Sequence, residues 1–133
     1  MANVEIWRKR CRLGLFAFYG FAGFLHLAFP APFLSITPDW VPDAPDVIML
    51  TGVCEIAGAI GLLMPQTRRY AGTALALYAI LVFPANLKHA ADSLSAPTTS
   101  SWQWAYHCLR LPLQPLFVWL AIFSGGRKRP RHI

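Results

Sequence analysis

Residues 47–64 read VIMLTGVCEIAGAIGLLM, an apolar and small-residue run that is interrupted by one carboxylate, Glu55. A bilayer core of about 30 Å requires about 20 helical residues, and about 17 is the practical minimum. The run therefore predicts a transmembrane helix. The acid near its middle predicts a buried polar site, because hydrocarbon tolerates an ionisable side chain only beside a partner or a wet cavity.

Three further apolar segments have similar lengths. Because backbone groups in lipid must hydrogen-bond internally, all of these segments are expected to be helices. The first follows a basic stretch, as in a signal peptide, but no Ala-x-Ala site follows it, so we expect a retained helix. We predict an all-α fold: one membrane domain over residues 1–133, built as a four-transmembrane-helix bundle with helices at about 13–29, 47–64, 70–87 and 105–124.

The composition supports a membrane protein. The chain is 56% hydrophobic and 14% charged, whereas soluble domains carry about 25% charged residues. Its net charge of +6 comes mainly from three short Lys/Arg clusters, which flank the apolar runs and form no binding stripe. The C-terminal run GRKRPR has an alternative reading as a nucleic-acid or anionic-lipid patch. A topogenic tail is favoured, and no nucleic-acid partner is expected.

The positions of the charges predict the orientation. Lys and Arg occur before the first span, at Arg68 and Arg69 between the second and third, and after the fourth, whereas the first loop carries only acids. By the positive-inside rule, both termini are expected in the cytoplasm and the first and third loops outside.

Five polar residues are expected at one level of the bundle. At a rise of 1.5 Å per residue, each of them falls in the outer half of its helix. An unpaired charge at mid-membrane costs a few kcal/mol or more, so we expect the five to meet, with Glu55 paired to Arg110 and hydrogen-bonded neighbours around them. The predicted polar cluster comprises His26, Glu55, Asn86, Arg110 and Gln114.

Local patterns support this cluster. Glu55 shares its helical face with Gly52 and Gly58, a small-residue face that lets membrane helices approach closely. Pro84 removes the helical donor of the Ile80 carbonyl, which Asn86 or Arg110 is expected to replace. His89 and His107 are expected near the outer boundary. A purely structural ion-pair network that fixes helix register stays an open alternative to a ligand or proton site.

The first loop, residues 30–46, combines five prolines with several large apolar side chains. We expect it to fold back over the outer mouth of the bundle as a stiff cap, with Trp40 at the membrane interface. The three cysteines have no CxxC or other metal-ligand spacing, so neither a disulfide framework nor a metal site is predicted. Cys54 and Cys108 are expected as buried free thiols, although their similar depth leaves a mutual approach open.

Several motifs in order resemble the DoxX-like membrane proteins: GFLH (23–26), PDWVP (38–42), GVCEIAGAIGLLMPQTRR (52–69), FPAN (83–86) and RLPLQ (110–114). The resemblance covers about residues 20–123. It implies a four-helix protein of the bacterial cytoplasmic (inner) membrane. The family takes its name from a small subunit of a thiosulfate:quinone oxidoreductase, and its relatives are associated with redox and thiol stress, methylamine utilisation and, in animals, receptor assembly. It implies no catalytic residue, although its motifs include the five polar positions.

Two functions follow as hypotheses. The first is a redox-associated accessory that binds a quinone or another lipophilic small molecule in the outer-half pocket, with Glu55 and His26 relaying protons. No haem, flavin or metal motif is present, so electrons would come from a partner and enzymatic activity stays open. The second is an assembly or chaperone-like protein with a structural polar cluster. A transporter is disfavoured, because four short helices leave little room for alternating access. The expected partners are the lipid bilayer and a membrane protein or further copies of the chain.

Overall fold

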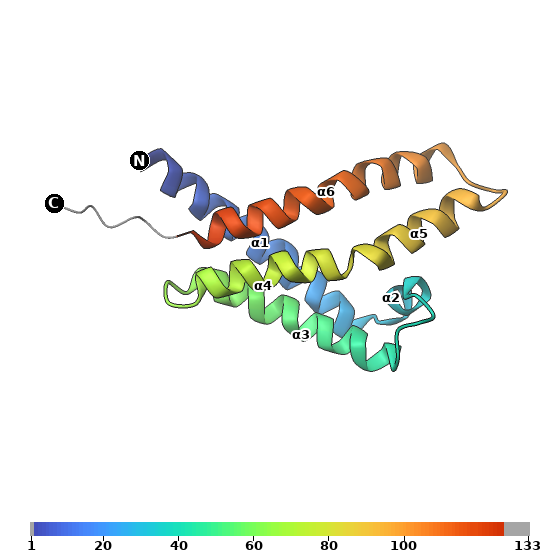
Figure 1. The fold of residues 1–133 in the computed structure, drawn as a ribbon, viewed down its shortest axis with the longest axis horizontal. Coiled ribbons are helices and arrows are strands. Elements are labelled where there is room, and N and C mark those ends of the chain that lie inside the picture. Colours follow the sequence, from blue (N-terminus) through green and yellow to red (C-terminus); the bar gives the residue numbers. More distant parts are fainter. Residues whose placement is uncertain (1, 127–133) are drawn as a thin grey trace.

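A computed structural model describes residues 2–126, and this part of the chain contains helices and no strand (Figure 1). Four helical segments are long and apolar enough to cross a membrane, with α4 and α5 together forming the third. The all-helical fold with four candidate spans is thus confirmed. The helices are α1 (Ala2–Ala28), α2 (Ala31–Ile36), α3 (Ala44–Leu63), α4 (Arg68–Leu81), α5 (Phe83–Ser95) and α6 (Ser101–Gly125).

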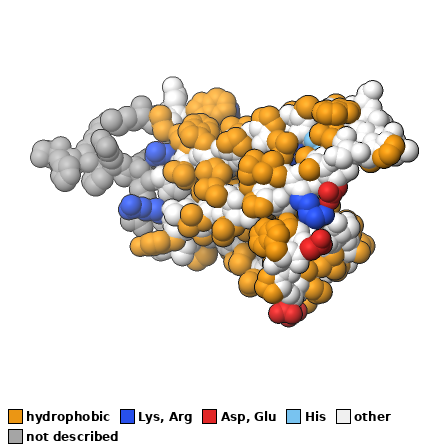
Figure 2. All heavy atoms as spheres, turned by 45° about the vertical axis from the view of Figure 1, so that its right-hand side comes forward, with side chains coloured by type: hydrophobic (Ala, Val, Ile, Leu, Met, Phe, Trp, Pro, Cys, Tyr) orange, Lys and Arg blue, Asp and Glu red, His pale blue; other side chains and the backbone are white. Residues whose placement is uncertain are grey.

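The four long segments close into a bundle. Helix α1 packs on α3, α3 on α4, α4 on α6, and α6 on α1. The centre is filled mainly by small and aliphatic side chains, including Leu62 and Ala59, which have no exposed surface. Many large apolar side chains instead point outward, and Figure 2 shows them covering much of one face, with charged side chains toward its two ends. Such a surface is suited to contact with lipid rather than with water.

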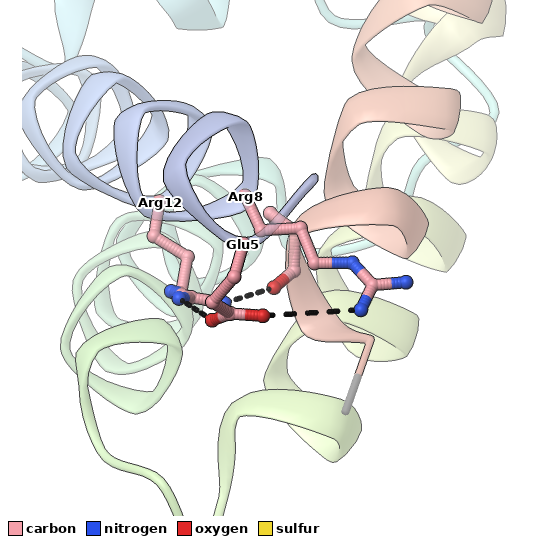
Figure 3. A network of polar contacts seen from close by, with 4 residues as sticks. Glu5, Arg8 and Arg12 are labelled. Carbon is pink, nitrogen blue, oxygen red and sulfur yellow. Dashed lines mark hydrogen bonds and ion pairs between the residues drawn. The ribbon is translucent and has the colours of Figure 1, made fainter. Parts of the chain in front are cut away.

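The first helix begins well before the predicted span. It starts at Ala2 rather than near residue 13, so the basic stretch expected as a flanking tail is helical. Arg12 within it is only 6% exposed. It donates to the backbone oxygen of Ser124 at 2.9 Å and to Glu5 at 2.6 Å (Figure 3). A residue interpreted from sequence as a topogenic charge therefore also fastens α1 to the end of α6.

The third span is broken at Val82, two residues before Pro84. A proline has no backbone N–H to donate, which interrupts the helical ladder at this point. Helix α5 then continues to Ser95, beyond the predicted end of the span near residue 87. The carbonyl that gains a side-chain partner is that of Ala79, which accepts from Gln114 Nε2 at 2.5 Å. The expectation of Asn86 or Arg110 bonding to Ile80 was wrong, because the Ile80 carbonyl accepts from the backbone N–H of Val82 at the end of α4.

The loop between the first two spans folds back over one end of the bundle, as expected. It contains the short helix α2, which contacts both α3 and α5. Phe33 of α2 stacks on the ring of His26, with centroids 3.7 Å apart. The loop thus bridges two sides of the bundle at the end that holds the polar residues.

Candidate ligand-binding site

A cavity of about 470 Å³ lies at the end of the bundle that α2 covers. Beyond the break at Val82, α5 packs on α6 and α2. The cavity lies between the α5–α6 pair and the α1–α3 pair, and residues of all four helices line it. Phe33, Ile36 and Thr37 from the cap segment form part of its wall. The remaining wall is largely apolar or aromatic and includes Phe18, Tyr19, Ile48, Val82, Leu113 and Phe117.

All five residues of the predicted polar cluster line this cavity. His26 comes from α1, Glu55 from α3 and Asn86 from α5. Arg110 and Gln114 come from successive turns of α6. Trp40, expected in the cap, is not among the lining residues and is 72% exposed. Depth along each helix was therefore sufficient to identify a common level, although the sequence does not specify which side chains touch.

Glu55 pairs with residues of α1 and α4. Glu55 is only 4% exposed. Tyr78 Oη donates to Glu55 Oε1 at 2.8 Å, and His26 Nδ1 lies 2.9 Å from Oε2. Within residues 2–126, no ion pair joins Glu55 to Arg110, so the predicted pairing was wrong. The reason is the order of helices around the bundle: α3 is packed between α1 and α4, whereas α6 lies across the cavity.

Arg110 belongs to a second group, which joins α5 to α6. Its guanidinium donates to Asn86 Oδ1 at 2.5 Å and lies 2.7 Å from His89 Nδ1. Asn86 in turn donates from Nδ2 to Gln114 Oε1 at 2.9 Å. Because Gln114 also bonds to the Ala79 carbonyl, these side chains hold the broken helix against α6. The cavity thus has one polar group on each of two facing walls.

The contact between His26 and Glu55 is close without being an aligned hydrogen bond. His26 Nδ1 lies 2.9 Å from the Ala22 carbonyl oxygen as well as 2.9 Å from Glu55 Oε2. The Ala22 carbonyl and an ionised Glu55 carboxylate are both acceptors, so the Nδ1 proton lies between two of them, and its hydrogen-bond geometry is met toward Ala22. Glu55 Oε2 is buried and has no hydrogen-bond donor. Phe33 holds the imidazole ring in place from the cap side.

Sequence reasoning missed three contributors to the site. Tyr78 was not distinguished from other aromatic residues of a membrane span, although its hydroxyl in an apolar segment requires a partner. His89 was expected only near the boundary, because the span was taken to end before it. It lies three residues after Asn86 on α5, on the same side of the helix. Phe33 was assigned to the cap loop without its contact to His26.

His107 is 2% exposed and packs edge-on against His89, with ring centroids 4.8 Å apart, so neighbouring side chains enclose it. Its level near the outer boundary stays a prediction. One other expectation changes. Cys54 and Cys108 are free but exposed, not buried, because they lie on outward faces of α3 and α6. Among residues 2–126, no group of three or more His, Cys, Asp or Glu side chains is placed to hold a metal ion.

A comparison with known protein families identifies the family of this chain. The family model described as a domain of unknown function (DUF8561) matches residues 15–124, and this range includes every polar residue of the cavity. The chain therefore belongs to that family. No curated protein and no solved structure matches it. The likeness to DoxX-like proteins stays a prediction from the sequence motifs.

Proposed function

We propose that this member of the DUF8561 family is a multi-pass protein of the bacterial cytoplasmic membrane that binds a quinone, or a similar lipophilic small molecule, in the cavity beneath α2. The observation that carries the proposal is one cavity with apolar and aromatic walls and two separate polar groups. Four apolar helical segments support the membrane location, and the bacterial assignment rests on the resemblance to DoxX-like proteins.

The size and lining of the cavity suit an amphipathic ring. Small-molecule sites usually enclose about 300–1,000 Å³ and have mostly apolar walls with a few placed polar groups. A quinone has a flat apolar body with oxygens on opposite edges. One oxygen would accept from Arg110, whose guanidinium has five N–H donors and uses only some of them on Asn86 and His89. The other would face His26 and Glu55 across the cavity.

Glu55 and His26 supply a place to hold a proton. Their facing atoms are 2.9 Å apart, and both residues line the cavity. A carboxylate beside an imidazole is suited to general acid–base transfer with a ring oxygen of the ligand. Electrons would come from a partner in the same membrane, which makes the protein a redox-associated accessory. This redox role rests on the DoxX resemblance.

The charge distribution supports an orientation with both termini in the cytoplasm. Arg12 of α1 contacts the end of α6, so the start and end of the described chain lie at the same end of the bundle. Arg68 and Arg69 begin α4, and the opposite end carries Asp39, Asp43 and Asp46 in and after the cap loop. By the positive-inside rule, the cavity and α2 would then face the outer side.

The test is binding of decylubiquinone to the protein in lipid nanodiscs, followed by tryptophan fluorescence and by thermal unfolding. Arg110→Ala is expected to weaken binding at least tenfold while leaving the protein folded. Arg69→Ala is the matched control, because it removes the same charge from an exposed position at the other end. Copurified lipophilic material identified by mass spectrometry would support the same conclusion.

The alternative, in which the polar cluster only stabilises the fold and the protein has an assembly role, predicts a different experimental result. The bonds from Gln114 to Asn86 and Ala79 stabilise the broken helix whether or not a ligand binds. If decylubiquinone shows no saturable binding and the wild-type protein copurifies with a stoichiometric membrane partner, the assembly role replaces the proposed one. Equal binding by wild type and Arg110→Ala would contradict the assigned site.

A further inference from the structure

A second hollow, of about 300 Å³, lies between α2 and the α5–α6 pair. His89 of α5 lines this hollow, whereas four residues line both the hollow and the larger cavity: Phe33, Ile36, Tyr106 and Arg110. The two spaces therefore adjoin. The guanidinium carbon of Arg110 lies 5.6 Å from the centroid of the Tyr106 ring, at the boundary that the spaces share. A molecule that occupies both spaces would contact Arg110.

The positive charge of Arg110 has no counter-ion within residues 2–126. Its guanidinium contacts Asn86 Oδ1 and His89 Nδ1, neither of which carries a negative charge, and none of the ion pairs includes it. Among the described residues that line the two spaces, Glu55 is the only acid, and it pairs with His26. Charges within membrane helices generally pair with an opposite charge or face a wet cavity. The arrangement therefore indicates that an anion belongs beside Arg110.

His89 adds a second hydrogen-bond donor to the hollow. A guanidinium only donates, so His89 Nδ1 accepts from Arg110 at 2.7 Å and the proton of the neutral ring is on Nε2. Arg110 also has more N–H groups than its two side-chain contacts use. The described lining of the hollow contains no carboxylate. Donors beside an uncompensated positive charge suit an oxyanion, and the planar fork of an arginine matches a carboxylate in particular.

Resting on the proposed function, we infer that the preferred ligand is an acidic amphiphile, whose carboxylate binds Arg110 and His89 in the hollow and whose apolar ring and tail fill the adjoining cavity. A carboxylate has a single negative charge, which matches the single positive charge of Arg110 beside a neutral imidazole. The cavity wall next to Arg110 includes Leu113 and Phe117, which suit the apolar part. A neutral quinone fills the same cavity but leaves the charge of Arg110 without a counter-ion.

The experiment compares three ligands on the wild-type protein in nanodiscs, at a pH at which carboxylic acids are ionised: 4-nonylbenzoate, its methyl ester and unsubstituted benzoate. Uptake by empty nanodiscs is subtracted. The ester retains the ring and tail and lacks the charge, whereas benzoate retains the charge and lacks the tail. We expect 4-nonylbenzoate to bind about tenfold or more tightly than either, because charge-assisted hydrogen bonds are roughly twice as strong as neutral ones and the tail occupies the apolar cavity.

Two variants test whether the anion binds at Arg110. Arg110→Gln keeps hydrogen-bond donors and removes the charge, so it is expected to abolish the preference for the acid over its ester. Lys88→Gln removes a positive charge from the residue next to His89, and Lys88 lines neither space. This control is expected to retain the preference. A folded Arg110→Gln protein that still prefers the acid would contradict the assigned site.

The outcomes distinguish this inference from the proposed function, with decylubiquinone as the reference ligand. Equal affinity of the wild type for the acid and its ester would show that water compensates Arg110, and it would overturn the inference alone where decylubiquinone binds. Benzoate binding as tightly as 4-nonylbenzoate would indicate a site for free anions and overturn the amphiphile. Absence of binding by all four ligands would overturn both proposals. The comparison of acid and ester requires no variant, so it decides the question even where Arg110→Gln fails to fold.

Discussion

Gly23 of α1 and Gly52 of α3 are in direct backbone contact. A Cβ atom at Gly23 would lie 2.6 Å from the Gly52 carbonyl oxygen, and one at Gly52 would lie 3.0 Å from that of Gly23. His26 and Glu55 each follow one of these glycines by three residues. Because small residues let membrane helices approach closely, this contact is what brings the imidazole to the carboxylate.

Gly23→Ala should separate α1 from α3 and weaken the site. The new methyl group would meet a backbone oxygen, which cannot rotate away as a side chain does. We expect a loss of about 1–3 kcal/mol in the free energy of unfolding, as for overpacked cores. Gly20→Ala is the matched control, since a Cβ there meets nothing within 4 Å. Unfolding of both variants in detergent measures the difference, and equal stability would contradict the contact.

Tyr78→Phe should destabilise the protein by leaving a second oxygen of Glu55 without a donor. Loss of one partner from a buried polar pair costs about 1–3 kcal/mol, and Tyr78 Oη lies 2.8 Å from Oε1. Tyr70→Phe removes a hydroxyl from the same helix at a residue that is 75% exposed and should be nearly neutral. Thermal unfolding of the two variants should therefore differ. A neutral Tyr78→Phe would show that the hydroxyl does not stabilise the carboxylate.

Arg12→Ala should loosen the end of the bundle opposite the cavity. Arg12 joins Glu5 to the Ser124 backbone oxygen (Figure 3), and its loss is expected to cost about 1–3 kcal/mol. Lys9→Ala removes the same charge from an exposed position on the same helix and should have little effect on unfolding. Comparing the two variants separates the contribution of Arg12 to stability from its contribution to membrane orientation, because both variants remove one positive charge from the same helix. Equal unfolding free energies of the two variants would show that Arg12 acts only as a charge that sets the membrane topology.

Double-mutant cycles should distinguish the observed pairings from the one that the sequence suggested. For Asn86 and Gln114, joined at 2.9 Å, we expect a coupling free energy of about 0.6 kcal/mol, the average for interhelical hydrogen bonds in membranes, and at most about 1.7 kcal/mol. For Glu55 and Arg110, we expect coupling near zero in the absence of ligand. Unfolding of the single and double Ala variants in one detergent gives both values. A large Glu55–Arg110 coupling would indicate a direct ion pair.

The orientation is testable with single cysteines introduced into a protein that lacks Cys11, Cys54 and Cys108. Trp40→Cys in the cap loop is expected to react in intact cells with a membrane-impermeant thiol reagent. Arg69→Cys is expected to react only after the cells are permeabilised. Both positions are exposed, so access depends on the side of the membrane. The reverse pattern would invert the topology derived from the positive-inside rule.

Much of the candidate site was predictable because depth in a membrane helix is a property of sequence. The rise per residue is fixed, so His26, Glu55 and Arg110 could be assigned to one level before their neighbours were known. The partners of Glu55 were not predictable in the same way. Nothing in its local pattern indicates whether α3 packs beside α6 or beside α1 and α4.

The sequence by itself determined four apolar helices, a covering loop and a common level for the polar side chains, because hydrocarbon thickness and the expense of burying charge act on each segment separately. The tertiary structure alone decided the pairings. Close contact at Gly23 and Gly52 sets α1 against α3, and the break at Val82 lets α5 follow α6 and α2. Those long-range packing choices separate Glu55 from Arg110 and leave a cavity between them.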